Sequence, residues 1–166
     1  MAEVTKRESL GCSELEGIVA LALDAARDLG VDQAEVAASQ DVGLSATARL
    51  GDIENLEFTN DRGVGITVYK NSCKGSASTS DTSPAAIREA VAKACSFASL
   101  TAQDKYAGLA DAERMATELF DLDLDHAWDI DANEAIALAI ETERAALSYD
   151  PRISNSEGGT VATNRG

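Results

Sequence analysis

Apolar and polar residues alternate almost without interruption between Leu44 and Ser80. Side chains two positions apart on a strand share a face, so this alternation predicts a ladder of half-buried antiparallel strands. The apolar positions form four runs: Leu44, Ala46, Ala48 and Leu50; Leu56 and Phe58; Val64, Ile66 and Val68; and Cys73, Gly75 and Ala77. Turn-forming residues separate the runs at 51–52, 60–63 and 70–72. A short strand over 34–38, with a turn at 41–43, is expected to lead into the ladder.

Three helices are expected around these strands. The first begins with a capping box of Ser13 and Glu16, presents an apolar stripe between positions 15 and 29, and ends at Gly30. Ser83 caps the second, and its expected buried stripe is Ile87, Ala90, Val91, Ala94 and Ala98. Asp131 and Glu134 form the capping box of a third helix, which Pro151 stops. Its expected inner side carries Ile136, Ala139, Ile140 and Leu147, with Glu143 as a charged exception.

This order of elements predicts an α+β fold, an antiparallel β-meander with flanking helices followed by the start of a second α+β domain. We expect an N-terminal domain at 1–100, an acidic interdomain linker at 101–130, where the periodicity is lost, and a truncated middle domain at 131–166. Strands of that last domain are expected to begin at Ile153 and Val161.

Composition and charge reduce the number of function classes that the chain can belong to. The 166 residues carry 29 acids and 14 bases, a net charge of −15. Such a chain repels a phosphate backbone, so direct nucleic-acid binding is not expected. The acids at 14, 16 and 24 are unlike a secretory signal, and no apolar run is as long as a membrane span. A cytoplasmic protein without membrane association is expected.

Catalytic chemistry is limited by the shortage of suitable side chains. His126 is the single histidine, and Cys12, Cys73 and Cys95 lack the close spacing of a zinc or redox motif. No catalytic, metal-binding or cofactor-binding residues are therefore predicted in this chain. We expect His126 to be a surface residue and the cysteines to be reduced, small apolar groups.

The most acidic stretch, 118–134, holds five aspartates and no lysine or arginine. Alternating aspartates can supply oxygen ligands to Ca²⁺ or Mg²⁺, but the glycine and glutamate of an EF-hand loop are missing. We favour the interpretation that the acids face water while the apolar residues of the linker pack against the domain: Leu119, Leu122, Leu124, Trp128 and Ile130.

The glycines of the ladder allow two interpretations. Gly63 and Gly65 lack the third glycine and the helix of a dinucleotide-binding motif. Gly65 and Gly75 relieve crowding within the sheet, or an exposed strand pairs with an extended polypeptide. A substrate or partner surface is accordingly predicted at Gly63, Gly65, Lys74 and Gly75.

Four stretches, in their order and spacing, resemble the PmbA/TldD family. They are Glu54–Phe58, Arg62–Tyr69, Lys74–Asp81 with the helix start at Ser83-Pro84, and Arg152–Gly159. The resemblance runs from about Leu15 to the last residue, and the residues at positions 54–81 are similar to those of the PmbA (TldE) branch. Family members are much longer, so we expect this chain to be an N-terminal fragment.

The resemblance implies a metallopeptidase system of two related subunits that acts on leader peptides or unfolded polypeptides, historically called a modulator of DNA gyrase. Zinc is expected in a TldD-type partner subunit, on a His-Glu-x-x-x-His helix that this chain lacks. The expected role here is substrate enclosure and subunit pairing, in a homo- or heterodimer. Two alternatives stay open: a noncatalytic acidic protein-binding module, and the N-terminal part of the zinc-bearing subunit.

Overall fold

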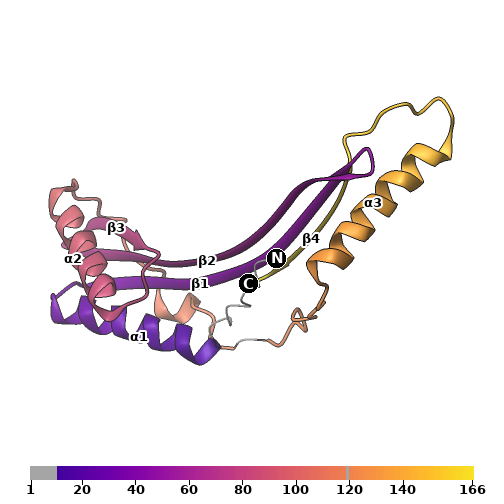
Figure 1. Ribbon diagram of the computed structural model, residues 1–166. Helices are drawn as coiled ribbons and strands as arrows, with labels where there is room; N and C mark the ends of the chain where they lie inside the picture. The colour runs from indigo at the N-terminus through magenta and orange to yellow at the C-terminus, as the bar shows by residue number, and fades with distance from the viewer. Residues whose placement is uncertain (1–10, 119) are drawn as a thin grey trace. The chain divides into compact units, whose positions relative to one another are not determined.

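The computed structural model describes residues 11–118 and 120–166 (Figure 1). Its elements are α1 (Cys12–Asp28), β1 (Gln33–Arg49), β2 (Asp52–Lys70), β3 (Cys73–Thr79), α2 (Pro84–Leu100), the 3-10 helix η1 (Ala112–Arg114), α3 (Ala132–Tyr149) and β4 (Gly159–Arg165). The strands form an antiparallel sheet in the order β3-β2-β1-β4. The α+β class expected from the sequence is therefore confirmed.

The chain folds into two compact units. The first unit combines the residues up to Gln40 with Asp61–Phe120, and the second combines Asp41–Asn60 with Asp121–Gly166. Both long strands, β1 and β2, contribute residues to each unit. The domain boundaries drawn from the sequence at 100 and 130 stay predictions.

Two of the predicted turns are absent, because β1 and β2 run unbroken through positions 41–43 and 60–63. Neither Gly43 nor Gly63 has the positive φ of a tight turn. A Cβ on Gly43 would lie 2.8 Å from Thr59 Oγ1 and 3.1 Å from the Thr163 carbonyl oxygen. Glycine is required there by the close approach of neighbouring strands, which the sequence pattern does not distinguish from a turn.

The other two turns are confirmed. The β1–β2 hairpin turns at Leu50 and Gly51, whose φ angles are 53° and 81°. The β2–β3 hairpin turns at Asn71 and Ser72, at 52° and 60°. Consecutive residues with positive φ give the twist that matches two antiparallel strands.

In the first unit, α1 and α2 cover one face of the sheet (Figure 1). The core joins small residues of both helices to the even-numbered face of β2: Ala22, Ala26, Val64, Ile66, Val68, Ile87, Ala90, Val91, Ala94 and Ala98. The buried stripe predicted for α2 is thus confirmed at every position. Ser83 Oγ accepts a hydrogen bond from the Ala86 N–H (3.4 Å), as the predicted cap requires.

The start of α1 differs from the prediction. The helix begins at Cys12 with Gly11 as N-cap, and Glu14 rather than Glu16 accepts the N-cap N–H at 2.8 Å. Glycine has no side chain to accept an N–H, so the cap at Gly11 lacks the sequence signal that Ser13 and Glu16 carry. Gly30 has the predicted left-handed conformation, with φ of 66°.

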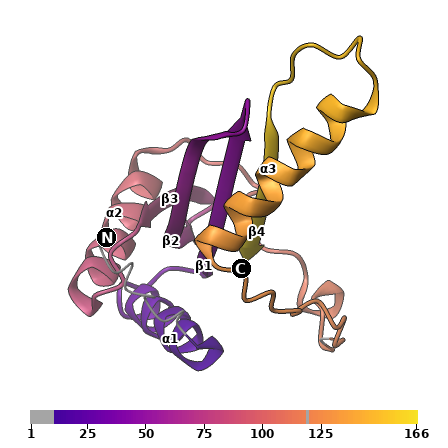
Figure 2. The same ribbon diagram turned by 45° about the vertical axis from the view of Figure 1, so that its right-hand side comes forward.

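In the second unit, α3 packs along β4, as Figure 2 shows. Asp131 and Glu134 form the predicted capping box, with both hydrogen bonds at 2.9 Å. The buried positions of α3 are Ala135, Ala139 and Glu143, whereas Ile136, Ile140 and Leu147 are only half-buried. Ala139 is thus buried as predicted, whereas Ala135 and the charged Glu143 take the buried positions expected for Ile136, Ile140 and Leu147. Val161 lies in β4, but Ile153 belongs to no strand.

The segment between α2 and α3 has no regular element other than η1 in its described residues, as the loss of periodicity indicated. The predicted packing of its apolar residues is wrong for three of them. Leu122, Leu124 and Trp128 are 68%, 80% and 60% exposed, and Ile130 is half-buried. Leu119 lies outside the described residues. Alternating aspartates leave each leucine flanked by charges, which favours water on both sides.

Candidate functional site

The face of the sheet opposite the helices in the first unit, called here the uncovered face, carries mostly small and polar side chains, with the buried Tyr69 as a large exception. Pairing of β2 with β3 places Gly65 opposite Ser78, Thr67 opposite Ser76, and Tyr69 opposite Lys74. These residues alternate with Val64, Ile66 and Val68, which face the helices. The part of this face around Thr67, Ser76 and Ser78 is therefore rich in hydroxyl groups, in contrast to the apolar face on the helix side.

The predicted surface residues divide between the two faces. Gly63, Gly65 and Lys74 share the uncovered face by the alternation of their strands. Gly75 lies on the other face, where an added Cβ would be 2.1 Å from the Ala94 carbonyl oxygen and 2.3 Å from the Ala98 nitrogen. Close packing against α2 explains Gly75, so it does not join the other three in one surface. An added Cβ at Gly65 would meet nothing within 4 Å.

A shallow open hollow lies on this face around Gly65. It is lined by residues of three strands, namely Glu35, Ala37, Gly65, Thr67, Ser76 and Ser78. The Thr67 and Ser76 hydroxyls hydrogen-bond across the strands at 3.0 Å. These hydroxyls can supply hydrogen bonds to a bound group.

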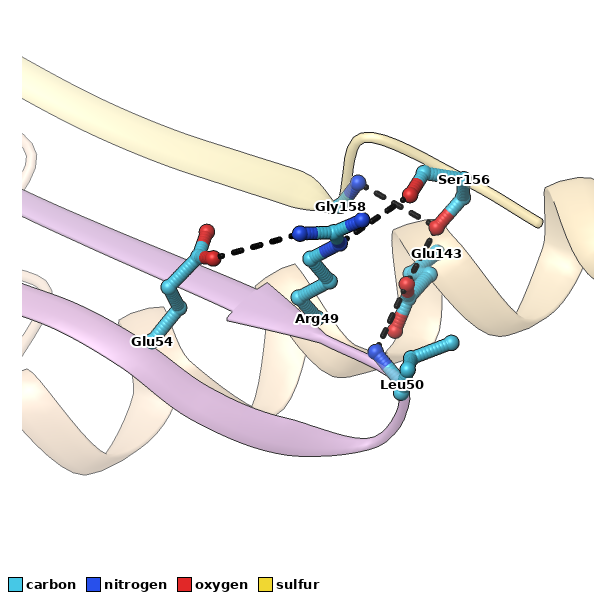
Figure 3. A network of polar contacts seen from close by, with 6 residues as sticks. All are labelled: Arg49, Leu50, Glu54, Glu143, Ser156 and Gly158. Carbon is cyan, nitrogen blue, oxygen red and sulfur yellow. Dashed lines mark hydrogen bonds and ion pairs between the residues drawn. The ribbon is translucent and has the colours of Figure 1, made fainter.

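A second polar cluster, which we did not predict, lies in the second unit around Glu143 (Figure 3). Its side chain is 2% exposed and points from α3 to the β1–β2 turn. The carboxylate accepts hydrogen bonds from the Leu50 N–H (2.8 Å), the Gly51 N–H (3.0 Å) and the Ser156 hydroxyl. One buried group thus joins a helix, a hairpin turn and the segment before β4.

Ser156 and Arg49 extend this cluster. Ser156 Oγ accepts from the Gly158 N–H at 3.2 Å, and Arg49 Nε donates to the Ser156 carbonyl oxygen at 3.3 Å. Arg49 also lies 3.8 Å from Glu54. The Ser156 hydroxyl, then the Leu50 and Gly51 amides, lower the pKa of Glu143, and Arg49 adds to this against the opposing effect of burial. Glu143 is therefore an ionised structural anchor whose carboxylate oxygens both accept hydrogen bonds. In the sequence, the only sign of this role is a charged residue on an otherwise apolar stripe of the helix.

The glycine pair at the start of β4 lies beside the same anchor. Gly158 has φ of 104°, which favours glycine, and a Cβ there would be 2.6 Å from the Ala48 carbonyl oxygen. A Cβ on Gly159 would be 2.2 Å from the Ala139 carbonyl oxygen. The stretch Arg152–Gly159 thus contains residues that let β4 approach both α3 and β1.

The acidic stretch holds one well-formed ion pair. Arg165 donates to both oxygens of Asp125, at 2.8 and 2.5 Å, and thereby lowers the pKa of that carboxyl. His126 is exposed at 71% of its side chain, as expected, with Nε2 2.7 Å from the Asp123 carbonyl oxygen. Across 11–118 and 120–166, no three His, Cys, Asp or Glu side chains are placed to hold a metal ion.

The three cysteines are free and lie in different environments. Cys12 is exposed, whereas Cys73 on β3 and Cys95 on α2 are half-buried. Cys95 packs against the core of the first unit, and burial raises its pKa while Lys70 opposes the shift. The expected apolar role fits Cys95 but not the exposed Cys12.

Comparison with protein families matches two segments in chain order. Residues 34–98 match the model of PmbA/TldA metallopeptidase domain 1, and residues 125–165 match that of the PmbA/TldA metallopeptidase central domain. The chain is 47% identical over 153 residues to a metalloprotease PmbA homolog of Haemophilus influenzae and 45% identical over 152 residues to metalloprotease PmbA of Escherichia coli O157:H7. Each alignment covers 92% of this chain and 34% of the relative, so the chain spans about a third of their length.

Solved structures show the same fold. TldE from Thermococcus kodakarensis matches with a TM-score of 0.66 and 16% identity, over 91% of this chain and 33% of that one. A protein of Bacteroides thetaiotaomicron described as a putative modulator of DNA gyrase matches with a TM-score of 0.74 and 21% identity, over 90% and 38%. The chain belongs to the PmbA/TldD metallopeptidase family, in its PmbA (TldE) branch, as the resemblance indicated. Among the described residues, no helix is long and apolar enough to cross a membrane.

Proposed function

We propose that this chain is part of a PmbA-like subunit that pairs with a zinc-bearing TldD-like subunit, or with a second copy, and helps enclose an unfolded or leader peptide in the cytoplasm. The family match at 47% identity carries this proposal. The relatives are named as metalloproteases, and this chain spans about a third of their length. We therefore extend to it a part in peptide cleavage and not the whole activity.

A supporting role follows from the chemistry of the side chains. A hydrolytic zinc ion needs three protein ligands, typically including two or more imidazole or thiolate groups, and leaves a position open for water. This sequence holds one histidine and three cysteines, and these lie on different elements. The zinc and the hydrolytic residues therefore belong to other parts of the assembly. Any effect of this protein on DNA gyrase would be indirect, because a chain with a net charge of −15 repels the phosphate backbone of DNA.

The uncovered face of the first unit supplies the contribution to enclosure. Gly63 and Gly65 share one face with Lys74, and they leave the backbone of β2 open enough for an extended peptide to approach it closely. Lys74 adds one positive charge for a peptide carboxylate.

Reconstitution tests the proposal. The full-length protein, its TldD-like partner and their mixture would be assayed for zinc content and for cleavage of an unfolded peptide. We expect cleavage by the mixture alone, with zinc in the partner. Stoichiometric zinc in the full-length PmbA-like protein, with chelator-sensitive cleavage by it alone, would contradict the proposal.

A second experiment tests the surface. Gly65→Tyr fills the hollow, and Ser148→Tyr on the exposed side of α3 is the matched control. We expect the first variant to raise KM for the peptide without changing the zinc content, and the second to leave KM unchanged. Equal KM values for both variants would remove the hollow from the proposed function.

A further inference from the structure

The tip of the β1–β2 hairpin, residues 50–53, departs from the usual residue choice for its turn. Leu50 and Gly51 occupy the two turn positions with φ of 53° and 81°. Glycine and asparagine adopt this left-handed region readily, whereas the Cβ of a leucine comes too close to the following carbonyl oxygen. The β2–β3 hairpin meets the same requirement with Asn71 and Ser72. Leucine at position 50 therefore needs a reason other than the turn.

Burial does not supply that reason, because Leu50 is 66% exposed. Ile53, three positions further on, is 54% exposed. Two branched apolar side chains are thus exposed to water at the end of a hairpin, where polar residues are the usual choice. Single exposed apolar residues are common on protein surfaces, but here the exposure coincides with a strained backbone. Strain and exposure at the same residue are typical of a binding role.

A buried carboxylate holds the hairpin tip in place. Glu143, which is 2% exposed, accepts the Leu50 N–H at 2.8 Å and the Gly51 N–H at 3.0 Å. Figure 3 shows the Leu50 amide facing Glu143 while the Leu50 side chain extends away from the carboxylate. The leucine is therefore presented in one backbone conformation. Such pre-organisation lowers the entropic cost of association, because no loose loop has to be ordered.

The charges around the hairpin tip indicate the chemistry of its partner. Asp52, Glu54 and Glu57 are exposed acids. Arg49 is the one base in positions 49–61, and it already contacts Glu54 and the Ser156 carbonyl oxygen. A surface with basic residues complements this arrangement, whereas a second copy of the chain carries the same net charge of −15. The charges therefore favour a different, more basic partner.

We propose that Leu50 and Ile53 enter an apolar pocket on a different protein subunit, and that lysine or arginine residues border this pocket. The inference rests on the proposed function and deepens it, because the subunit is the zinc-bearing partner proposed above. Burial of the two exposed side chains favours association. Basic residues at the border of the pocket speed the encounter and disfavour a second copy of this chain.

Leu50→Asn tests the inference, because stability and binding should change in opposite directions. Asparagine adopts the left-handed conformation more readily, so the melting temperature of the full-length protein without its partner is expected to rise by about 2–4 °C. Binding to the TldD-like subunit, measured by isothermal titration calorimetry, is expected to weaken at least about tenfold, since apolar burial is lost. Ile53→Thr, which keeps the branched Cβ of a strand residue, is expected to weaken binding without raising the melting temperature.

Two control variants separate the hairpin tip from the rest of the surface. Leu100→Asn removes a leucine that is 81% exposed at the end of α2, and it should leave binding unchanged. Asn71→Leu introduces the same strain into the other hairpin, so it should lower the melting temperature and leave binding unchanged. Raising sodium chloride from about 50 mM to about 300 mM is expected to weaken binding of the wild type, as a basic border requires.

Each contrary result has a distinct meaning. Equal binding of the wild type and Leu50→Asn to the TldD-like subunit would leave the pairing intact and overturn the inference. A lower melting temperature of Leu50→Asn without partner would overturn it too, because the protein's own chain would then cover Leu50. Self-association of the wild type that Leu50→Asn abolishes, measured by sedimentation, would make the occupant a second copy. Absence of binding between the wild-type subunits would contradict the proposed pairing itself, and the inference with it.

Discussion

Single residues anchor elements of this protein through hydrogen bonds that a conservative change removes. Glu143 is the clearest case, with a helix side chain that accepts two backbone amides and a hydroxyl. Buried polar groups of this kind stabilise the fold only when all partners are satisfied, so removing one acceptor leaves donors without water or protein.

Glu143→Gln is expected to lower the melting temperature of the protein by about 5 °C at pH 7, since an amide nitrogen cannot accept the Gly51 N–H. Because the pKa of Glu143 is lowered in the folded state, its ionised form stabilises the fold above the unfolded pKa of about 4.3. That contribution is lost as pH falls through the folded pKa.

Thermal unfolding from pH 7 down to pH 3 measures both effects. The difference between the wild type and the Gln variant should shrink below about pH 4. Glu141→Gln is the control, because Glu141 lies two positions before Glu143 on α3 and is exposed. A constant difference at every pH would contradict the role of the charge.

Thiol reactivity gives another prediction at this scale. Cys12 is exposed, whereas Cys95 is half-buried with a raised pKa, so less thiolate is present at Cys95. Iodoacetamide at about pH 8 should modify Cys12 first. Mass spectrometry of digested samples measures each site, and faster labelling at Cys95 would disagree with the packing of α2.

At the scale of elements, two glycines determine how closely helices approach strands. Gly75 brings β3 against α2, and Gly159 brings β4 against α3. In both places the atoms that a Cβ would meet belong to the helix backbone, which cannot rotate away as a side chain could.

Gly75→Ala is expected to destabilise the protein by about 2 kcal/mol or more, because α2 must shift to admit the methyl group. Gly65→Ala on the adjacent strand is the control, since a Cβ there meets nothing within 4 Å. Urea denaturation measures both variants. If the two lost equal stability, the effect would come from glycine replacement in general and not from contact with α2.

The sequence was sufficient for elements defined by local chemistry. The cap and buried stripe of α2, the capping box of α3 and the turn at Asn71 follow from side chains within a few positions of one another. It was insufficient at Gly43, where glycine signals a turn and a close approach of strands equally well, and at Gly63, which lies within β2 without the positive φ of a turn.

The candidate sites show the same division. Alternation along β2 puts Gly63 and Gly65 on one face of the sheet. The pairing register of β2 with β3, which the structure supplies, adds Lys74 to that face. The Glu143 anchor depends on contacts across 92 and 93 positions of chain. No local pattern indicates a contact over such a distance, so the sequence alone presents Glu143 as a charged exception on an apolar stripe and not as a buried acceptor.

For the whole molecule, the excess of acids over bases dominates the electrostatics. The ion pairs Arg27–Asp24, Lys93–Glu89 and Arg165–Asp125 are exposed by 60% or more on each side chain. Exposed pairs contribute about 0–1 kcal/mol each, whereas a net charge of −15 repels itself throughout the fold.

The melting temperature is therefore expected to rise as potassium chloride increases from about 20 mM to about 300 mM, because screening of repulsion outweighs screening of the pairs. Differential scanning calorimetry measures the shift, with an uncharged osmolyte at equal osmolality as the control. A falling melting temperature would mean that attractive pairs dominate.

The pairing of β1 with β4 also affects how the protein is made. Val42 pairs with Arg165, so 123 positions separate the two partners (165 − 42). At about 5–20 residues per second, a ribosome takes about 6–25 s to add that length. During this interval the nascent β1 has no β4 beside it, and Ala46 and Ala48 lack their strand partners Val161 and Gly159. A chaperone that binds short apolar segments could therefore bind β1 during this interval, before β4 leaves the ribosome.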